Sequence, residues 1–242
     1  MGFDYEQDAM GFELNDTFRI QRIFLEKHLR GLSGSDSSLK ALDLGCGAGF
    51  GTKGVFQNFT FDHPKLDIHG LDISAIALKK YSEVTGLQGQ AGSVLNTGFQ
   101  PSYFDLILFD DVLEHLVETD LAIREIYRIL SPDGLLLIAT PNLASWFNRI
   151  ALLMGIQPAF SEVSSERVYG RPGTETVGHL RLFTHRALLE FLSQEGFEVL
   201  QRRSSTFHAL PRSIRFLDKF FALSPRLGAN LVLVCKKRIE AT

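Results

Sequence analysis

Short apolar runs alternate along most of the chain with longer segments in which apolar residues recur at helical spacing. Two runs, 104–109 and 135–139, are almost continuously apolar, which is typical of strands that helices cover on both faces of a mostly parallel sheet. We therefore expect one α/β domain over residues 1–242. The predicted strands are 41–44, 66–72, 87–94, 104–110, 134–140, 197–204 and 230–236, and the predicted helices are 51–59, 74–85, 119–130, 142–154, 184–195 and 212–223.

Two further segments frame this alternation. A helix at about 15–30, which Asn15 or Asp16 can cap, carries apolar residues at positions 18, 20, 23, 24 and 25. Residues 142–180 form a cover or insertion, whose first helix would start at Pro141. The apolar stripe of that helix packs on the core, covers an active site or touches lipid, and the aperiodic stretch 156–179 is long enough to be functional. The stripe consists of Leu143, Trp146, Phe147, Ile150, Leu153 and Met154.

Composition narrows the range of partners and compartments. The 242 residues are 45% hydrophobic and 22% charged, and no apolar run reaches the length of a transmembrane helix. The two cysteines, Cys46 and Cys235, do not suggest a disulfide framework, so we expect a cytoplasmic protein. The net charge of −3 argues against nucleic acid as a partner. Residues from 200 onward nevertheless carry nine Lys or Arg and two acids, a balance that suits transient contact with an anionic membrane.

A glycine turn follows the first predicted strand. Gly45, Gly47, Gly49 and Gly51 come directly after the apolar strand 41–44, and glycine there lets the backbone pass close to a bound ligand. An acid, Asp72, ends the next strand. A glycine turn after one strand and an acid after the next predict a nucleoside site at the edge of an α/β sheet.

Two nucleoside ligands compete for this arrangement, a nicotinamide dinucleotide and S-adenosylmethionine. Residues 49–54 match G-x-G-x-x-G literally, but the first glycine of that match lies five residues beyond Leu44, whereas a dinucleotide motif starts where the strand ends. Asp43, two residues before Gly45, suits a ligand with an ammonium group, which dinucleotides lack. These residues favour S-adenosylmethionine.

Residues 42–49, Leu-Asp-Leu-Gly-Cys-Gly-Ala-Gly, resemble the first motif of the class I S-adenosylmethionine-dependent methyltransferases. The resemblance continues through 70–74, 104–115 and 129–138, and implies a Rossmann-like, seven-stranded, mostly parallel sheet whose last strand, 230–236, is antiparallel. It further implies cofactor contacts on three segments. The methionyl part would lie against Gly45, Cys46, Gly47 and Gly49 with Asp43 and Asp110 nearby, the ribose on Asp72, and the adenine on Ile73, Ser93 and Val94.

The segment after the fourth strand would lie beside the transferred methyl group. It contains Asp111, Glu114 and His115, and three interpretations stay open. His115 can act as a general base. Alternatively, these residues and His179 bind a divalent metal such as Mg²⁺, because the acid-x-x-Glu-His pattern resembles the metal sites of ubiquinone-pathway O-methyltransferases and small-RNA 2′-O-methyltransferases. In the third interpretation, Glu114 and His115 only shape the loop.

We therefore predict an enzyme that transfers a methyl group from S-adenosylmethionine to a small molecule. Its candidate catalytic residues are Glu114, His115 and His179. A hydroxyl acceptor is expected, on a hydrophobic, quinone-like or lipid- or glycan-linked substrate. The alternatives are a non-catalytic partner protein with the cofactor fold, an NAD-linked oxidoreductase and an RNA 2′-O-methyltransferase. The sequence leaves the oligomeric state open.

Overall fold

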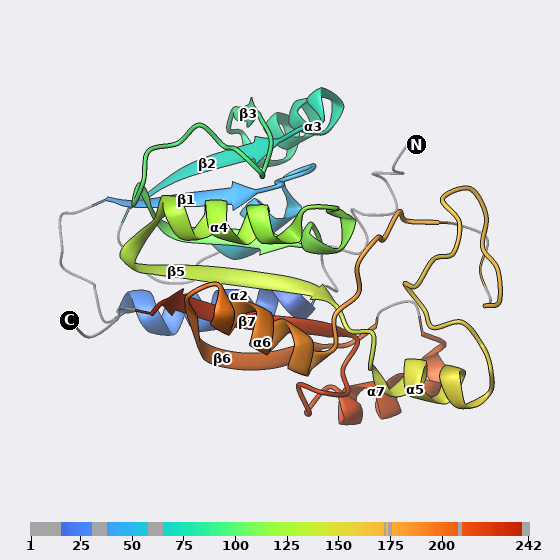
Figure 1. The fold of residues 1–242 in the computed structure, drawn as a ribbon. Helices are drawn as coiled ribbons and strands as arrows, with labels where there is room; N and C mark the ends of the chain where they lie inside the picture. The colour runs from blue at the N-terminus through green and yellow to red at the C-terminus, as the bar shows by residue number, and fades with distance from the viewer. Residues whose placement is uncertain are drawn as a thin grey trace.

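Seven strands form a single sheet in the order β3-β2-β1-β4-β5-β7-β6 (Figure 1). The computed structural model describes residues 16–30, 38–57, 65–171, 173, 176–207 and 210–238. Only β7 runs antiparallel to its neighbours, β5 and β6, while the remaining pairs are parallel. The Rossmann-like, seven-stranded sheet with an antiparallel last strand is thus confirmed. The strands are β1 (Leu39–Leu44), β2 (Leu66–Asp72), β3 (Gly89–Ala91), β4 (Phe104–Asp110), β5 (Leu130–Pro141), β6 (Phe197–Ser205) and β7 (Asn230–Lys237).

Helices cover both faces of the sheet, as Figure 1 shows. One face packs against α2 and the short π-helical turn η1, and the other packs against α4 and α6. Alternate residues of β4 serve the two faces, Leu106 and Leu108 on one and Ile107 and Phe109 on the other. The helical elements are α2 (Asp16–Arg30), η1 (Thr52–Gln57), α3 (Ala75–Thr85), η2 (Leu113–His115), α4 (Thr119–Ile129), α5 (Trp146–Leu153), α6 (His185–Gln194), η3 (Arg212–Ile214) and α7 (Arg215–Phe221).

The expected elements are present, but several of their boundaries differ, two of them for identifiable reasons. The strand expected at 87–94 is only three residues long, because the chain turns after Gly92 and the Ser93 hydroxyl accepts the Leu95 N–H. The start of α5 at Pro141 was wrong, because β5 continues through that residue. Positions 15, 58–59, 172 and 174–175 of the predicted elements lie outside the described residues.

The N-terminal helix α2 buries a different face from the one that its apolar residues suggest. Its buried residues are Thr17, Gln21, Leu25 and Leu29, which recur every four positions, whereas Ile23 is 53% exposed. Two polar side chains therefore point inward from α2. One of them, Gln21, reaches the carboxyl end of β4 and becomes part of the candidate site.

Helices α5 and α7 pack against each other beside the end of β5, at the lower right of Figure 1. The Trp146 ring stacks on Phe221 at a centroid distance of 5.2 Å, and its Nε1–H donates to Asp218 at 2.8 Å. The apolar stripe of α5 is therefore divided, since Trp146 packs inward while Leu153 stays exposed. Among the described residues, no helix is long and apolar enough to span a bilayer.

Candidate active site

The glycine turn after β1 folds back onto the end of β2. Gly45, Gly47 and Gly49 have φ angles of +76°, +50° and +86°, a region that side-chain-bearing residues rarely adopt. A Cβ on Gly45 would lie 2.5 Å from the Val112 side chain, so this glycine lets the turn approach the segment after β4. A Cβ on Gly47 would meet no described atom within 4 Å. The turn therefore leaves an open side at Gly47, where a ligand can approach its backbone.

Asp72 ties this turn to the start of α3. One of its carboxylate oxygens accepts the Gly47 N–H at 2.9 Å and the other accepts the Ser74 N–H at 2.8 Å. Each oxygen has further lone-pair capacity, because an ionised carboxylate offers about four acceptor sites. Asp72 can therefore accept ribose hydroxyls while it holds the turn. The next residue, Ile73, is 82% exposed and free to pack on a flat ring.

Asp43 lies beneath the turn, in a buried network with η1. Its carboxylate accepts the Thr52 hydroxyl at 2.6 Å, and the same hydroxyl is 3.3 Å from the Tyr81 hydroxyl. Burial raises the pKa of Asp43 to about 6, against the hydrogen bonds from Thr52 that lower it. Cys46 is buried nearby, and burial raises the pKa of its thiol, so it remains a neutral packing residue rather than a nucleophile.

Asp110, at the end of β4, is half-buried, and one of its carboxylate oxygens is buried without a hydrogen-bond partner among the described residues. Its Oδ1 accepts the Gln21 Nε2–H at 2.7 Å, whereas its Oδ2 has no hydrogen-bond partner among the described residues. Burial raises the pKa of Asp110 well above its ordinary value, and the charge of Asp111 adds to the effect. An ammonium group beside Asp110 would satisfy this oxygen and favour its charged form. The site thus fits the amino-acid end of S-adenosylmethionine.

The turn after β3 carries the two residues expected beside an adenine. Ser93 pairs with Asn96 across this turn, and its hydroxyl is engaged by the Leu95 N–H at 3.2 Å. Val94 packs on the main apolar cluster. The structure places both residues in the loop that follows β3, two or three positions beyond its last residue.

A second group of polar side chains lies beyond β4, where Glu114, His115 and His179 come together. One ligand atom from each of these residues lies within 4.8 Å of the others. The Glu114 side chain is fully buried, and its Oε2 accepts the Thr140 hydroxyl at 2.9 Å. Its Oε1 has no hydrogen-bond partner among the described residues and lies 3.9 Å from His179 Nε2. Asp111 is outside this cluster.

Backbone carbonyls orient both imidazoles of the cluster. His179 Nδ1 is 2.9 Å from the Phe160 carbonyl oxygen, and His115 Nδ1 is 3.2 Å from that of Gly178. Because a carbonyl can only accept, we assign the proton to Nδ1 in each ring, which leaves each Nε2 with a lone pair. Both rings can therefore accept a proton or bind a cation through Nε2.

The pKa shifts in the cluster favour the neutral forms of His179 and Glu114. Burial lowers the pKa of His179, while the bond to the Phe160 carbonyl opposes that shift. Burial, together with the negative charge of Asp111, raises the pKa of Glu114 to about 8. The His179 imidazole is therefore neutral and can accept a proton or a cation. The ionised form of Glu114 has no positive charge beside it within the residues that the structure describes, so a cation that entered the cluster would stabilise that form.

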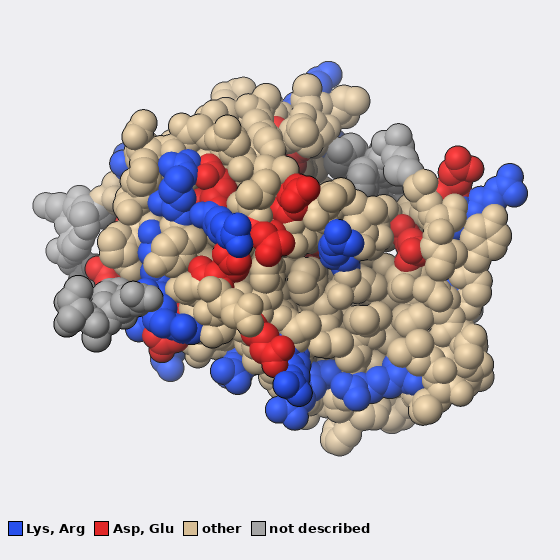
Figure 2. Space-filling model, in the orientation of Figure 1, with Lys and Arg blue, Asp and Glu red and all other residues tan. Residues whose placement is uncertain are grey.

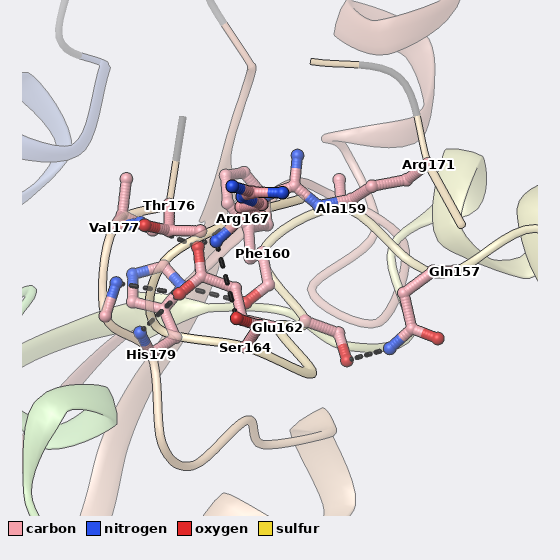
Figure 3. A network of polar contacts seen from close by, with 12 residues as sticks. Gln157, Ala159, Phe160, Glu162, Ser164, Arg167, Arg171, Thr176, Val177 and His179 are labelled. Atoms are coloured by element: carbon pink, nitrogen blue, oxygen red, sulfur yellow. Dashed lines mark hydrogen bonds and ion pairs between the residues drawn. The ribbon is translucent and has the colours of Figure 1, made fainter. Parts of the chain in front are cut away.

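Glu162 holds the loop that carries His179, as Figure 3 shows. Its carboxylate accepts the backbone N–H groups of Val177 at 2.6 Å, Gly178 at 2.8 Å and His179 at 3.2 Å. It also lies 3.6 Å from the Arg171 guanidinium. Sequence reasoning missed Glu162 because the stretch 156–179 has no periodicity that would mark an acid as inward-facing.

Two residues of the site adopt a strained backbone conformation. Asp111 and Phe160 have φ angles of +52° and +69°, which is uncommon for non-glycine residues and unfavourable for a bulky one. Asp111 directly follows β4, and Phe160 supplies the carbonyl that orients His179. The surrounding contacts therefore hold local strain in the two segments that shape the cluster.

A glycine turn and an acid at the carboxyl edge of a parallel sheet, next to a buried acid–histidine cluster, define a group-transfer enzyme with a nucleoside cofactor. The family model described as "Methyltransferase domain" matches residues 35–196, and the chain belongs to this family. It is an S-adenosylmethionine-dependent methyltransferase. This result confirms the predictions of an enzyme and of S-adenosylmethionine as its cofactor, and it rejects the NAD-linked alternative.

The names of individual similar proteins specify different methylated atoms, oxygen in one and nitrogen in another. The chain is 25% identical to a ubiquinone biosynthesis O-methyltransferase of Idiomarina loihiensis over 223 residues, which are 88% of this chain and 79% of that protein. It is 30% identical to phosphoethanolamine N-methyltransferase 2 of Caenorhabditis elegans over 103 residues, 40% of this chain and 22% of that protein. A solved S-adenosylmethionine-dependent methyltransferase from Methanosarcina mazei has the same fold, with a TM-score of 0.60, 18% identity and coverage of 87% and 97% of the two chains.

Proposed function

We propose that this methyltransferase acts on a hydroxyl oxygen of a small, largely apolar molecule. The observation that carries the proposal is the pair of imidazoles with free Nε2 lone pairs beside the buried Glu114. A hydroxyl group is a poor nucleophile until its proton leaves, whereas an amine can attack as the free base. A proton acceptor beside the reacting edge is therefore most useful to an oxygen acceptor.

The residues of the chain divide the work between cofactor and acceptor. When bound, S-adenosylmethionine supplies the methyl group on a sulfonium centre. Asp72 would hold its ribose, the Gly47 backbone would lie against its methionyl part, and Asp110 would accept a hydrogen bond from its amino group. On the acceptor side, the O–H bond breaks as the O–CH₃ bond forms, and the proton passes to Nε2 of His115 or His179. The burial of Glu114 and the small exposed fraction of the His179 side chain limit the access of competing water to the reaction.

Aromatic side chains around the cluster support an apolar acceptor. The Phe160 ring lies 6.0 Å from His179 and 5.1 Å from Phe207, measured between ring centroids. Phe147 stacks on Phe207 at 5.5 Å. The similarity to the ubiquinone biosynthesis O-methyltransferase spans most of the chain, while the similarity to the N-methyltransferase spans less than half of it. Both observations favour an oxygen on an aromatic or quinone-like skeleton.

A divalent cation is a second route for removing the proton, because it would lower the pKa of a bound hydroxyl. Glu114 Oε1, which lacks a partner among the described residues, and the two imidazoles offer three ligand atoms within 4.8 Å of one another. One carboxylate and two imidazoles suit a first-row transition-metal ion such as Mn²⁺ better than Mg²⁺, which prefers oxygen ligands. Water or acceptor oxygens would fill the other positions. Glu114, His115 and His179 would hold this ion. Asp111 would stay outside the first coordination sphere.

The test uses three alkyl-substituted acceptors of matched shape, a catechol, a 2-aminophenol and an aniline. Product formation is followed by mass spectrometry, which identifies the methylated atom. We expect O-methylation, and we expect a loss of about 100-fold in rate when His115 and His179 are both changed to Gln. His28→Gln, on the exposed side of α2, is the matched control. Methylation of nitrogen alone, or full activity of the double variant, would contradict the proposal.

Exhaustive chelation separates the two routes for the proton. If the imidazoles act alone, turnover survives chelation and the double variant is inactive. If a cation is needed, chelation stops turnover and added Mg²⁺ or Mn²⁺ restores it. Direct metal titration by calorimetry should then show one site in the original protein and none in Glu114→Gln.

A further inference from the structure

Helices α5 and α7 expose an unusual number of large apolar side chains on adjacent surfaces. Leu153 is 88% exposed and Leu223 is 80% exposed. On α7, Phe216 and Phe220 lie one turn apart (i, i+4) on one exposed face, and Leu223 follows in the turn after the helix. We call these residues the α5–α7 face: Leu152, Leu153, Met154, Phe216, Phe220 and Leu223.

This apolar exposure is not a sign of loose packing, because the opposite sides of both helices are well ordered by specific contacts. Trp146 stacks on Phe221 and donates to Asp218. Asn148 is buried, and its amide bonds the Asn142 and Ala159 carbonyls. The two helices therefore hold their outer side chains in a fixed arrangement. Several large exposed apolar side chains on two helices that pack together are typical of an interaction site.

Within residues 146–154 and 215–223, the charged side chains that are exposed to solvent are all basic. Arg149, Arg215 and Lys219 are exposed. The only acid within 146–154 and 215–223 is Asp218, which is 1% exposed and accepts hydrogen bonds from the Trp146 indole and the Phe207 amide. In Figure 2 the lower right part of the molecule, where Figure 1 draws α5 and α7, is mostly tan and carries a row of basic side chains.

We propose that the α5–α7 face docks the enzyme on the surface of an anionic membrane. Exposed Leu, Met and Phe side chains insert among acyl chains at the interface, and neighbouring Lys and Arg side chains attract anionic headgroups. A second copy of the chain fits this surface less well. A two-fold contact would bring the same basic residues of both copies together without an exposed acid to balance them.

The α5–α7 face lies close in the fold to the acid–histidine cluster, so docking would bring the cluster near the membrane. Asn142 follows β5 directly, and its side chain bonds the Gly228 carbonyl behind α7. Two residues earlier, Thr140 donates to Glu114. The face is thus attached to the same edge of the sheet as the acid–histidine cluster. A docked enzyme would present that edge toward the bilayer, where an apolar acceptor dissolves.

Vesicle sedimentation of the full chain tests the docking without any methyl acceptor, so its outcome is independent of the proposed O-methylation. We expect binding to phosphatidylcholine vesicles that contain phosphatidylglycerol, and weaker binding when phosphatidylglycerol is absent or salt is high. Leu153→Glu combined with Phe220→Glu should reduce the partition coefficient at least about tenfold. Arg149→Gln with Lys219→Gln should reduce it about tenfold for anionic vesicles only.

Leu121→Glu, at an exposed apolar position of α4, is the matched control and should bind vesicles like the unmodified protein. S-adenosylmethionine affinity and melting temperature show whether each variant is folded. Failure of the unmodified protein to sediment with anionic vesicles would overturn the proposal. Light scattering that shows a dimer in solution, converted to a monomer by Leu153→Glu with Phe220→Glu, would assign the face to a second copy instead.

Discussion

The carboxylate of Glu162 should control the order of the loop that carries His179. It accepts three backbone N–H groups from residues 177–179, at distances between 2.6 and 3.2 Å, and its side chain is 5% exposed. No other hydrogen bond to these three amides is present in the described part of the chain. Removing the carboxylate should therefore release this short segment and leave the sheet intact.

The size of the effect follows from the number of bonds. A hydrogen bond to a charged acceptor contributes about 1.5–3 kcal/mol. In Glu162→Gln one oxygen becomes an amide NH₂ that cannot accept, so at least one bond and the charge are lost, or about 2–3 kcal/mol. This corresponds to a rise of roughly 50-fold in the opening equilibrium of the segment. Glu162→Ala should raise it further, because all three bonds are lost.

Amide hydrogen exchange measures this opening directly. The amides of Val177, Gly178 and His179 should exchange roughly 50-fold faster in Glu162→Gln, while those of β5 stay unchanged. Glu166→Gln, an exposed acid of the same segment, is the control and should leave exchange unaltered. Methyl transfer should fall about 100-fold, since a displaced His179 loses its position, and S-adenosylmethionine should still bind normally through Asp72.

Two results would refute this reasoning. Unchanged exchange at 177–179 in Glu162→Gln would mean that other contacts order the loop. Equally faster exchange in β5 would mean that Glu162 supports the whole fold rather than the loop. In either case Glu162 would not be a positioning residue for His179.

Four further variants test the cofactor side and the core. Asp72→Asn should weaken S-adenosylmethionine binding about 30-fold by calorimetry, because charge-assisted bonds are lost; native affinity would contradict its role. Gly49→Ala should lower the unfolding free energy by about 3 kcal/mol in urea, since its Cβ would come within 2.6 Å of α3 side chains at positive φ. Gly47→Ala should lower the unfolding free energy by only about 1 kcal/mol but should impair cofactor binding. Equal losses of unfolding free energy in Gly47→Ala and Gly49→Ala would refute the open side at Gly47. Bonds from Arg128 and Thr97 lower the pKa of Glu125 to about 2, so its contribution to stability is present above pH 4.5 and lost as the pH falls toward 2; the difference of about 2 kcal/mol between the original protein and Glu125→Gln should shrink over that range.

The cofactor side of the site was predictable because sheet geometry decides it. Parallel strands end at a common edge, so Gly45 and Asp72 had to lie close together wherever the helices packed. The acceptor side depends on contacts between segments far apart in the chain. His179 approaches Glu114 because the loop between them folds back onto Glu162 and because the Leu180 and Arg181 N–H groups donate to the Glu114 carbonyl. No sequence periodicity specifies that fold.

Gln21 illustrates a signal that was present but easy to miss. A pattern built on apolar residues alone places the buried face of α2 near Ile23, which is exposed. The four-residue spacing of Thr17, Gln21, Leu25 and Leu29 marks the true buried face. A polar side chain within such a stripe needs a buried partner, and here the partner is Asp110. Its identity depends on tertiary packing, which sequence spacing does not reveal.

The hydrogen bond between Gln21 and Asp110 has a practical consequence for protein production. The matched family region, residues 35–196, excludes both α2 and the antiparallel strand β7. An expression clone trimmed to that region would remove the amide donor of Asp110 and leave both of its oxygens without a protein partner. It would also expose the edge of β5, which pairs with β7 along most of its length. Any minimal clone of this enzyme should therefore begin before Asp16 and end after Lys237.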